Sequence, residues 1–101
     1  MKVSFLRYAQ RELDDAVSYY ESEQVGLGVK FRSEVSRALN RVVAFPKSYQ
    51  SFGARTRRCL DPRFPYSIFY RFDSDASEIL VVAVAHLHRG PDYWVDRESQ
   101  T

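Results

Sequence analysis

Residues 79–94 read ILVVAVAHLHRGPDYW, and this stretch decides the fold. Its first seven residues, Ile79 to Ala85, are all apolar and include three valines. A short apolar run rich in β-branched residues predicts a strand that is buried on both faces. The residues that follow contain both histidines and the only tryptophan of the chain. We therefore expect a buried strand that delivers a candidate site to one edge of the domain.

Three earlier segments also have the composition of strands, because they are short and rich in aromatic or β-branched residues. In chain order they are Val3–Leu6, Thr56–Leu60 and Tyr66–Phe72. The polar residues Asp73 to Ser77 predict a hairpin loop before the buried strand Glu78–Ala85. Lys47–Ala54 is expected to be a loop. The last three strands should then form an antiparallel meander, because the links between them are short.

The segment between the first two strands predicts two helices. In the first helix one apolar stripe repeats with the helical period and consists of Ala9, Leu13, Ala16, Val17 and Tyr20. Gly26 is a natural stop after it, and Pro46 ends the second helix, Leu27 to Phe45. The order is β-α-α-β-β-β. We therefore predict an α+β fold in which residues 1–101 form a single domain, with a small, mainly antiparallel sheet and a helical hairpin packed on one face.

Composition narrows the class of protein. The chain has 101 residues, of which 45% are hydrophobic and 28% charged, and these are ordinary values for a globular domain. Its longest apolar run is far shorter than the ~20 residues that a membrane span needs. Its one cysteine, Cys59, has no partner for an internal disulfide. We expect a cytoplasmic protein without a membrane partner.

The residues after the buried strand offer candidate catalytic groups. His86 is either a half-buried structural histidine or a proton shuttle, since its unperturbed pKa is close to neutrality. Arg89 either holds a phosphate or pairs with a nearby aspartate, and Tyr93 can stack on a base or act as an acid or base. We expect His86 and His88 to point to opposite sides of the strand end. The sequence has no HExxH or CxxC pattern, so we expect neither a metal nor a cofactor.

Other residues are candidates for binding a partner. Arg57, Arg58 and Arg71 lie on predicted strands and can form a basic sheet face for an RNA backbone or for an acidic partner peptide. The alternative is a solvated face without a binding role. Trp94 is the fourth candidate for binding the antitoxin or the target, and we expect it to be an anchor packed on the sheet in preference to a platform for base stacking.

The chain resembles the RelE/ParE superfamily of toxins from type II toxin–antitoxin modules. The resemblance rests on blocks spread over nearly the whole sequence: AQRELDDAVSYYE at 9–21, GLGVKFRSEV at 26–35, RRCL at 57–60, FPYSIFYR at 64–71 and residues 79–97. It implies a small sheet with a helical hairpin on one face. It also implies a growth-inhibiting toxin that a cognate antitoxin neutralises.

Members of the superfamily act on one of two kinds of target. RelE-like members cut mRNA on the ribosome with basic residues and a tyrosine or histidine, and Tyr93 matches their C-terminal tyrosine. RelE-like members usually carry an arginine in the middle strand, where this chain has Ser67. They also carry a basic residue just after the last strand, near the position of the apolar Leu87 in this chain. The resemblance therefore favours a ParE-like toxin that binds DNA gyrase. The alternative is a metal-independent endoribonuclease in which His86, Arg89 and Tyr93 supply base, cation and acid.

Overall fold

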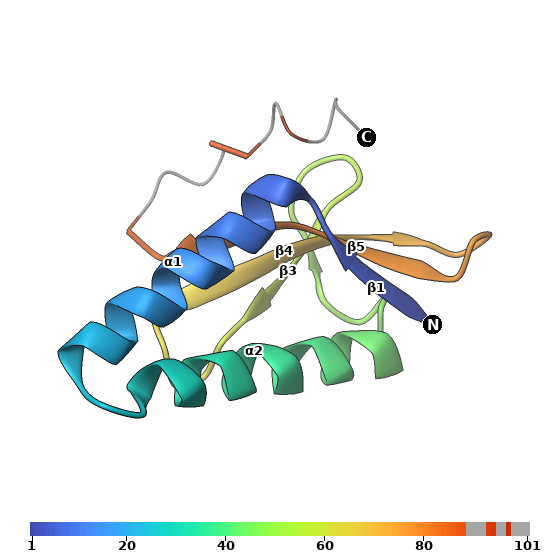
Figure 1. Cartoon of the computed structure of the whole chain (residues 1–101). Coiled ribbons are helices and arrows are strands. Elements are labelled where there is room, and N and C mark those ends of the chain that lie inside the picture. The colour runs from blue at the N-terminus through green and yellow to red at the C-terminus, as the bar shows by residue number, and fades with distance from the viewer. Residues whose placement is uncertain (89–92, 95–96, 98–101) are drawn as a thin grey trace.

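The computed structural model describes residues 1–88, 93–94 and 97 of the chain. This part of the chain forms a five-stranded sheet with a helical hairpin packed on one face (Figure 1). In chain order the elements are β1 (Lys2–Phe5), α1 (Arg7–Glu23), α2 (Leu27–Ala44), β2 (Gln50–Ser51), β3 (Arg57–Leu60), β4 (Tyr66–Asp73) and β5 (Glu78–His86). The predicted α+β class and the order of the predicted elements are confirmed.

The strands lie in the order β1-β5-β4-β3-β2. β3, β4 and β5 form the predicted antiparallel meander, and β1 pairs with β5 in parallel. The prediction of a loop from Lys47 to Ala54 is wrong for two residues, because Gln50 and Ser51 pair with β3. A strand of two residues is too short to show an alternating pattern in the sequence.

The interior strand β5 has one irregularity that matters for the site. Phe69 of β4 lies opposite Ala83, but the next residue, Tyr70, lies opposite Val81. Val82 is therefore an extra residue, as in a β-bulge. On the other side of β5, pairing with β1 ends at Val81, opposite Phe5. Beyond this point no strand of the described residues covers that edge of β5.

The helical hairpin is closed by a tight turn. Gly26 has a φ of 88°, a left-handed conformation that glycine adopts without steric cost. Glu21 accepts hydrogen bonds from the backbone N–H groups of Gly26, at 2.8 Å, and Gly28, at 3.0 Å. A Cβ on Gly28 would lie 2.5 Å from the Val17 carbonyl oxygen, so the two helices approach closely there. This contact fixes the relative position of the two helices.

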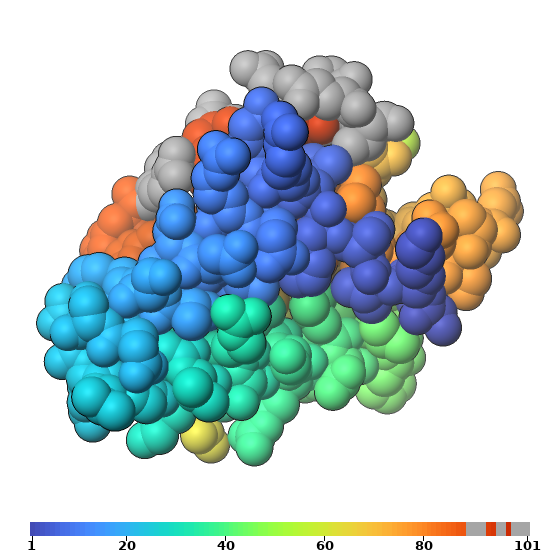
Figure 2. All heavy atoms as spheres, in the orientation of Figure 1, coloured from blue at the N-terminus to red at the C-terminus, as the bar shows by residue number. Residues whose placement is uncertain are grey.

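Both faces of the sheet are packed. The larger core lies between the sheet and the hairpin, whose helices form much of the surface seen in Figure 2. It contains Ala9, Leu13 and Ala16 of α1, Phe31, Val35, Ala38 and Val42 of α2, and Cys59, Ile68, Tyr70, Ile79, Val81 and Val84 of the sheet. The smaller core lies on the opposite face and contains Phe69, Val82, Ala83, Ala85 and Trp94. Within the described residues, neither helix is long and apolar enough to cross a membrane.

Candidate functional site

The uncovered edge of β5 is completed by side chains. Glu12 of α1 accepts a hydrogen bond from the Val84 N–H at 3.1 Å. Arg97 donates to the Val82 carbonyl at 3.3 Å and forms an ion pair with Glu12 at 2.8 Å. Buried backbone groups need such partners, because water cannot reach them. The Glu12–Arg97 pair thus supplies the hydrogen bonds that a neighbouring strand would otherwise make.

Tyr93 is held by the same pair. Its hydroxyl donates to Glu12 Oε2 at 2.5 Å, and its ring centroid lies 5.0 Å from the Arg97 guanidinium carbon. The guanidinium also lies over the Tyr8 ring, at 5.2 Å. The Glu12 and Arg97 side chains are only 14% and 15% exposed, so these interactions are weakly screened by water. The hydroxyl of this candidate catalytic tyrosine is therefore engaged by a carboxylate.

His86 lies at the end of β5, next to the same carboxylate. Its Nδ1 accepts a hydrogen bond from the His88 N–H at 3.1 Å, and the two imidazole rings stack with centroids 4.8 Å apart. The expectation that these histidines point to opposite sides is wrong, because residues two apart on a strand share a face. With Nδ1 occupied, Nε2 is the ring nitrogen left for a further partner.

A pocket of about 280 Å³ opens between α1 and the end of β5. The described residues that line it are Glu12, Asp15, Ala16, Tyr19, Tyr66, Val84 and His86. It contains two carboxylates and no lysine or arginine from the described part of the chain. Burial raises the pKa of Tyr66, and the nearby Tyr20, Tyr19 and Glu12 add to this shift. The environment of His86 is therefore acidic. Arg89, the third predicted catalytic residue, lies outside the described residues.

The predicted basic sheet face is only partly correct. Arg57 lies on the face with the helices, where it donates to the Tyr49 carbonyl at 2.7 Å. Its neighbour Arg58 lies on the opposite face, with its guanidinium 5.0 Å from the centre of the Phe52 ring. Arg71 shares that second face, two residues after Phe69 in β4. Arg57 cannot join them, because successive residues of a strand point to opposite faces.

Trp94 is packed against the second face of the sheet, as predicted for an anchor. It is 2% exposed, and its ring lies 4.9 Å from Phe69 and 6.2 Å from Phe52. It therefore supports the sheet and offers almost no surface to a partner. Ser67, which stands in place of an arginine, lies on the same face and is also 2% exposed. No cationic side chain occupies that position of β4.

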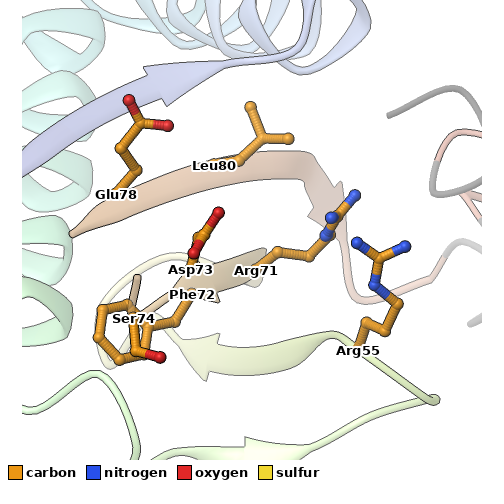
Figure 3. Close-up of a pocket in the computed structure, with 7 residues that line it drawn as sticks. All are labelled: Arg55, Arg71, Phe72, Asp73, Ser74, Glu78 and Leu80. Carbon is orange, nitrogen blue, oxygen red and sulfur yellow. The ribbon is translucent and has the colours of Figure 1, made fainter. Parts of the chain in front are cut away.

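A second pocket, of about 530 Å³, lies on the second face near the β4–β5 hairpin (Figure 3). Arg55 and Arg71 both line this pocket, with their guanidinium groups directed toward it, and Asp73 and Glu78 line it further along (Figure 3). Asp73 Oδ1 already accepts hydrogen bonds from two backbone N–H groups of the hairpin, those of Asp75 and Ala76. The Glu78 carboxylate lies 4.0 Å from the Lys2 ammonium group. This region of the surface therefore combines two arginines with carboxylates that have partners of their own.

Several of these residues carry no pattern in the sequence that predicts a role in the site. Glu12 lies outside the apolar stripe of α1, and only its contacts reveal that it faces β5. Arg55 lies in a segment without periodicity. Arg97 was part of the block that carried the resemblance, but its role depends on where β1 ends. Among residues 1–88, 93–94 and 97, no three His, Cys, Asp or Glu side chains converge as a metal site would require.

Comparison with known proteins agrees with this architecture. The family model described as ParE toxin of type II toxin-antitoxin system, parDE, matches residues 3–91. No curated protein sequence matches the chain significantly. Three similar solved structures come from toxin–antitoxin systems.

The chromosomal ParDE system of P. aeruginosa includes a chain that is 20% identical, with a TM-score of 0.69 over 85% of this chain and 95% of that one. The isolated E. coli RelE toxin is 16% identical, with a TM-score of 0.66 over 99% and 98% of the two chains. The RelBE2 complex of Mycobacterium tuberculosis gives 19% identity and a TM-score of 0.58 over 84% and 88%. At these identities the three structures show a shared fold.

Proposed function

This chain belongs to the ParE toxin family of type II toxin–antitoxin systems, and we propose that it inhibits growth by binding DNA gyrase. In this proposal the toxin does not cleave RNA, and a cognate antitoxin neutralises it. The family model supports the class of protein, and the geometry around His86 supports the choice of target.

The acidic lining of the His86 pocket carries the proposal. In-line cleavage of RNA needs a cation for the charge that develops on the phosphate, together with a base and an acid. The pocket instead presents Glu12, which is already paired with Arg97, and the exposed carboxylate of Asp15, whose charge repels a phosphodiester. The Tyr93 hydroxyl is bound to Glu12, and Ser67 provides no mid-strand cation. These features favour a toxin that acts by binding.

A RelE-like, ribosome-dependent endoribonuclease is the second candidate. One observation favours it: His86 and Tyr93 both lie next to Glu12, so the fold brings two of the three predicted catalytic residues into one region. In that function His86 would take the 2′-OH proton and Tyr93 would protonate the leaving oxygen.

A supercoiling assay with purified DNA gyrase tests the first candidate. Micromolar toxin is expected to inhibit supercoiling, and His86→Ala with Tyr93→Phe is expected to leave this inhibition intact. Circular dichroism would verify that the double variant is folded, because Tyr93→Phe removes a hydrogen bond to Glu12. Full gyrase activity in the presence of excess folded toxin would contradict the proposal.

Primer extension on mRNA from expressing cells tests the second candidate. The binding function predicts intact messages and a double variant that still arrests growth. Cuts within translated codons that disappear in the His86→Ala, Tyr93→Phe variant would instead establish the endoribonuclease.

We also propose that the antitoxin places an acidic segment against Arg55 and Arg71. Two guanidinium groups that line one pocket suit carboxylates, which arginine can bind through paired hydrogen bonds. Arg55 is exposed and makes no ion pair within the described residues, so its charge is available to a partner. The antitoxin candidate is the product of the neighbouring reading frame.

Calorimetry with that protein would measure the contribution of each arginine. Arg55→Glu and Arg71→Glu should each weaken binding by about tenfold or more, because like charges would then face one another. Arg32→Glu is the matched control, since Arg32 is exposed on α2, on the other side of the sheet. If all three variants bound the antitoxin with equal affinity, this surface would be excluded as its binding site.

A further inference from the structure

The pocket beside His86 has the properties of a site for a cationic side chain. Glu12 and Asp15 project from one face of α1, three residues apart, and the Tyr19 and Tyr66 rings also line the space. Glu12 is already paired with Arg97. Asp15 is exposed and makes no ion pair or side-chain hydrogen bond within the described residues. The pocket therefore has one carboxylate without a cation, beside two aromatic rings.

We propose that this pocket binds the guanidinium group of an arginine side chain presented by a partner protein. The site is separate from the Arg55–Arg71 surface and selects the opposite charge. It goes beyond the proposed function, because it names a recognition chemistry that holds for any partner protein. It also gives the acidic surroundings of His86 a role that catalysis does not supply.

The chemistry of the lining favours arginine over other guests. A planar guanidinium stacks on tyrosine and can bind a carboxylate through two hydrogen bonds, whereas an ammonium group lacks this shape. His86 and Tyr66 also line the pocket and carry polar groups that can contact a guanidinium. A phosphate or carboxylate guest is disfavoured, since it would face the negative charge of Asp15.

The surroundings of the pocket favour a peptide over a free amino acid. Tyr19 is 56% exposed and Leu87, directly after His86, is 50% exposed. Tyr19 lines the pocket and Leu87 adjoins the lining residue His86 in the chain, so exposed apolar side chains near the pocket can contact residues that flank the arginine. A free arginine would use only the pocket itself.

Nuclear magnetic resonance titration of the full chain tests the proposal with three probes: acetyl-Leu-Arg-Leu-amide, the same peptide with citrulline, and free arginine. The arginine peptide should produce saturable shifts of the Val84 amide and the His86 ring, with a dissociation constant of order millimolar. Citrulline has the same shape without the charge and should bind at least about fivefold more weakly. Free arginine should also bind more weakly than the arginine peptide.

Two variants of α1 provide the matched comparison. Asp15→Asn should weaken the arginine peptide by about fivefold, because it removes the unpaired carboxylate. Asp14→Asn causes the same change in net charge outside the pocket, where Asp14 accepts a hydrogen bond from Gln10, and should leave the affinity unchanged. Absence of saturable shifts, equal binding of the citrulline peptide, or equal effects of the two variants would each overturn the proposal. Equal affinity for free arginine would overturn the assignment to a partner protein.

Discussion

Glu12→Ala is expected to lower the free energy of unfolding by about 3 kcal/mol. The carboxylate accepts hydrogen bonds from the Val84 N–H, the Tyr93 hydroxyl and Arg97. Leaving a buried N–H without a partner costs about 1–3 kcal/mol, and removing one member of a buried ion pair costs about 3–5 kcal/mol. Because Glu12 and Arg97 remain 14% and 15% exposed, the expected total lies near the lower end of the second range.

Urea unfolding at neutral pH measures this loss, and amide hydrogen exchange at Val84 shows whether the edge of β5 opens. Glu12→Gln keeps an acceptor for the Val84 N–H but removes the charge, so its loss should be intermediate. Asp15→Ala, one turn later on α1, is the control and should change stability by less than about 0.5 kcal/mol. A loss below about 1 kcal/mol for Glu12→Ala, with unchanged exchange at Val84, would refute the role assigned to this carboxylate.

Three further outcomes follow from the core and the hairpin. Gly28→Ala should destabilise the fold by about 1–3 kcal/mol in urea unfolding, because the new methyl group would lie 2.5 Å from the Val17 carbonyl oxygen. The control is Ser36→Ala at an exposed position of the same helix, and it should be nearly neutral. Burial raises the pKa of Tyr70 to about 12, so the unfolded chain loses the phenol proton at lower pH than the folded protein. The free energy of unfolding should therefore fall as pH rises from about 10 to 12. Tyr70→Phe should flatten that decline in unfolding measurements. Cys59 is 1% exposed, and burial raises the pKa of its thiol. A thiol reagent should therefore label Cys59 only as fast as the protein opens. Rapid labelling of the native protein would contradict this burial.

Elements with a long hydrophobic pattern were predictable from the sequence. The run from Ile79 to Ala85 is an interior strand whose residues face packed cores on both sides of the sheet, although the middle strand of the five is β4. The apolar stripe of α1 was equally clear, since Ala9, Leu13 and Ala16 recur with the helical period and are buried. Gly26 and Pro46 marked the turn and the end of the hairpin through backbone geometry alone.

Features that depend on long-range contacts were not predictable in this way. Glu12 has the same side chain as many solvated residues, and its role arises only because β1 ends where β5 continues. The bulge at Val82 follows from the pairing of two strands and leaves no mark on either strand alone. Arg57, Arg58 and Arg71 looked like one basic group in the sequence, yet the alternation of β3 divides them between two faces. The candidate site is therefore less predictable than the fold, because it consists of such contacts.

The parallel pairing of β1 with β5 has a consequence for the order in which parts of the fold can form during translation. Lys2 and Val3 precede their partners, Glu78 and Ile79, by more than 70 residues, so they are synthesised well before them. Until then β1 has no neighbour in the sheet, while the local contacts of the helical hairpin can already form. A message truncated before Glu78 would therefore encode a hairpin without its sheet. Neither the Arg55–Arg71 surface nor the His86 pocket can exist on the nascent chain before β5 has been translated.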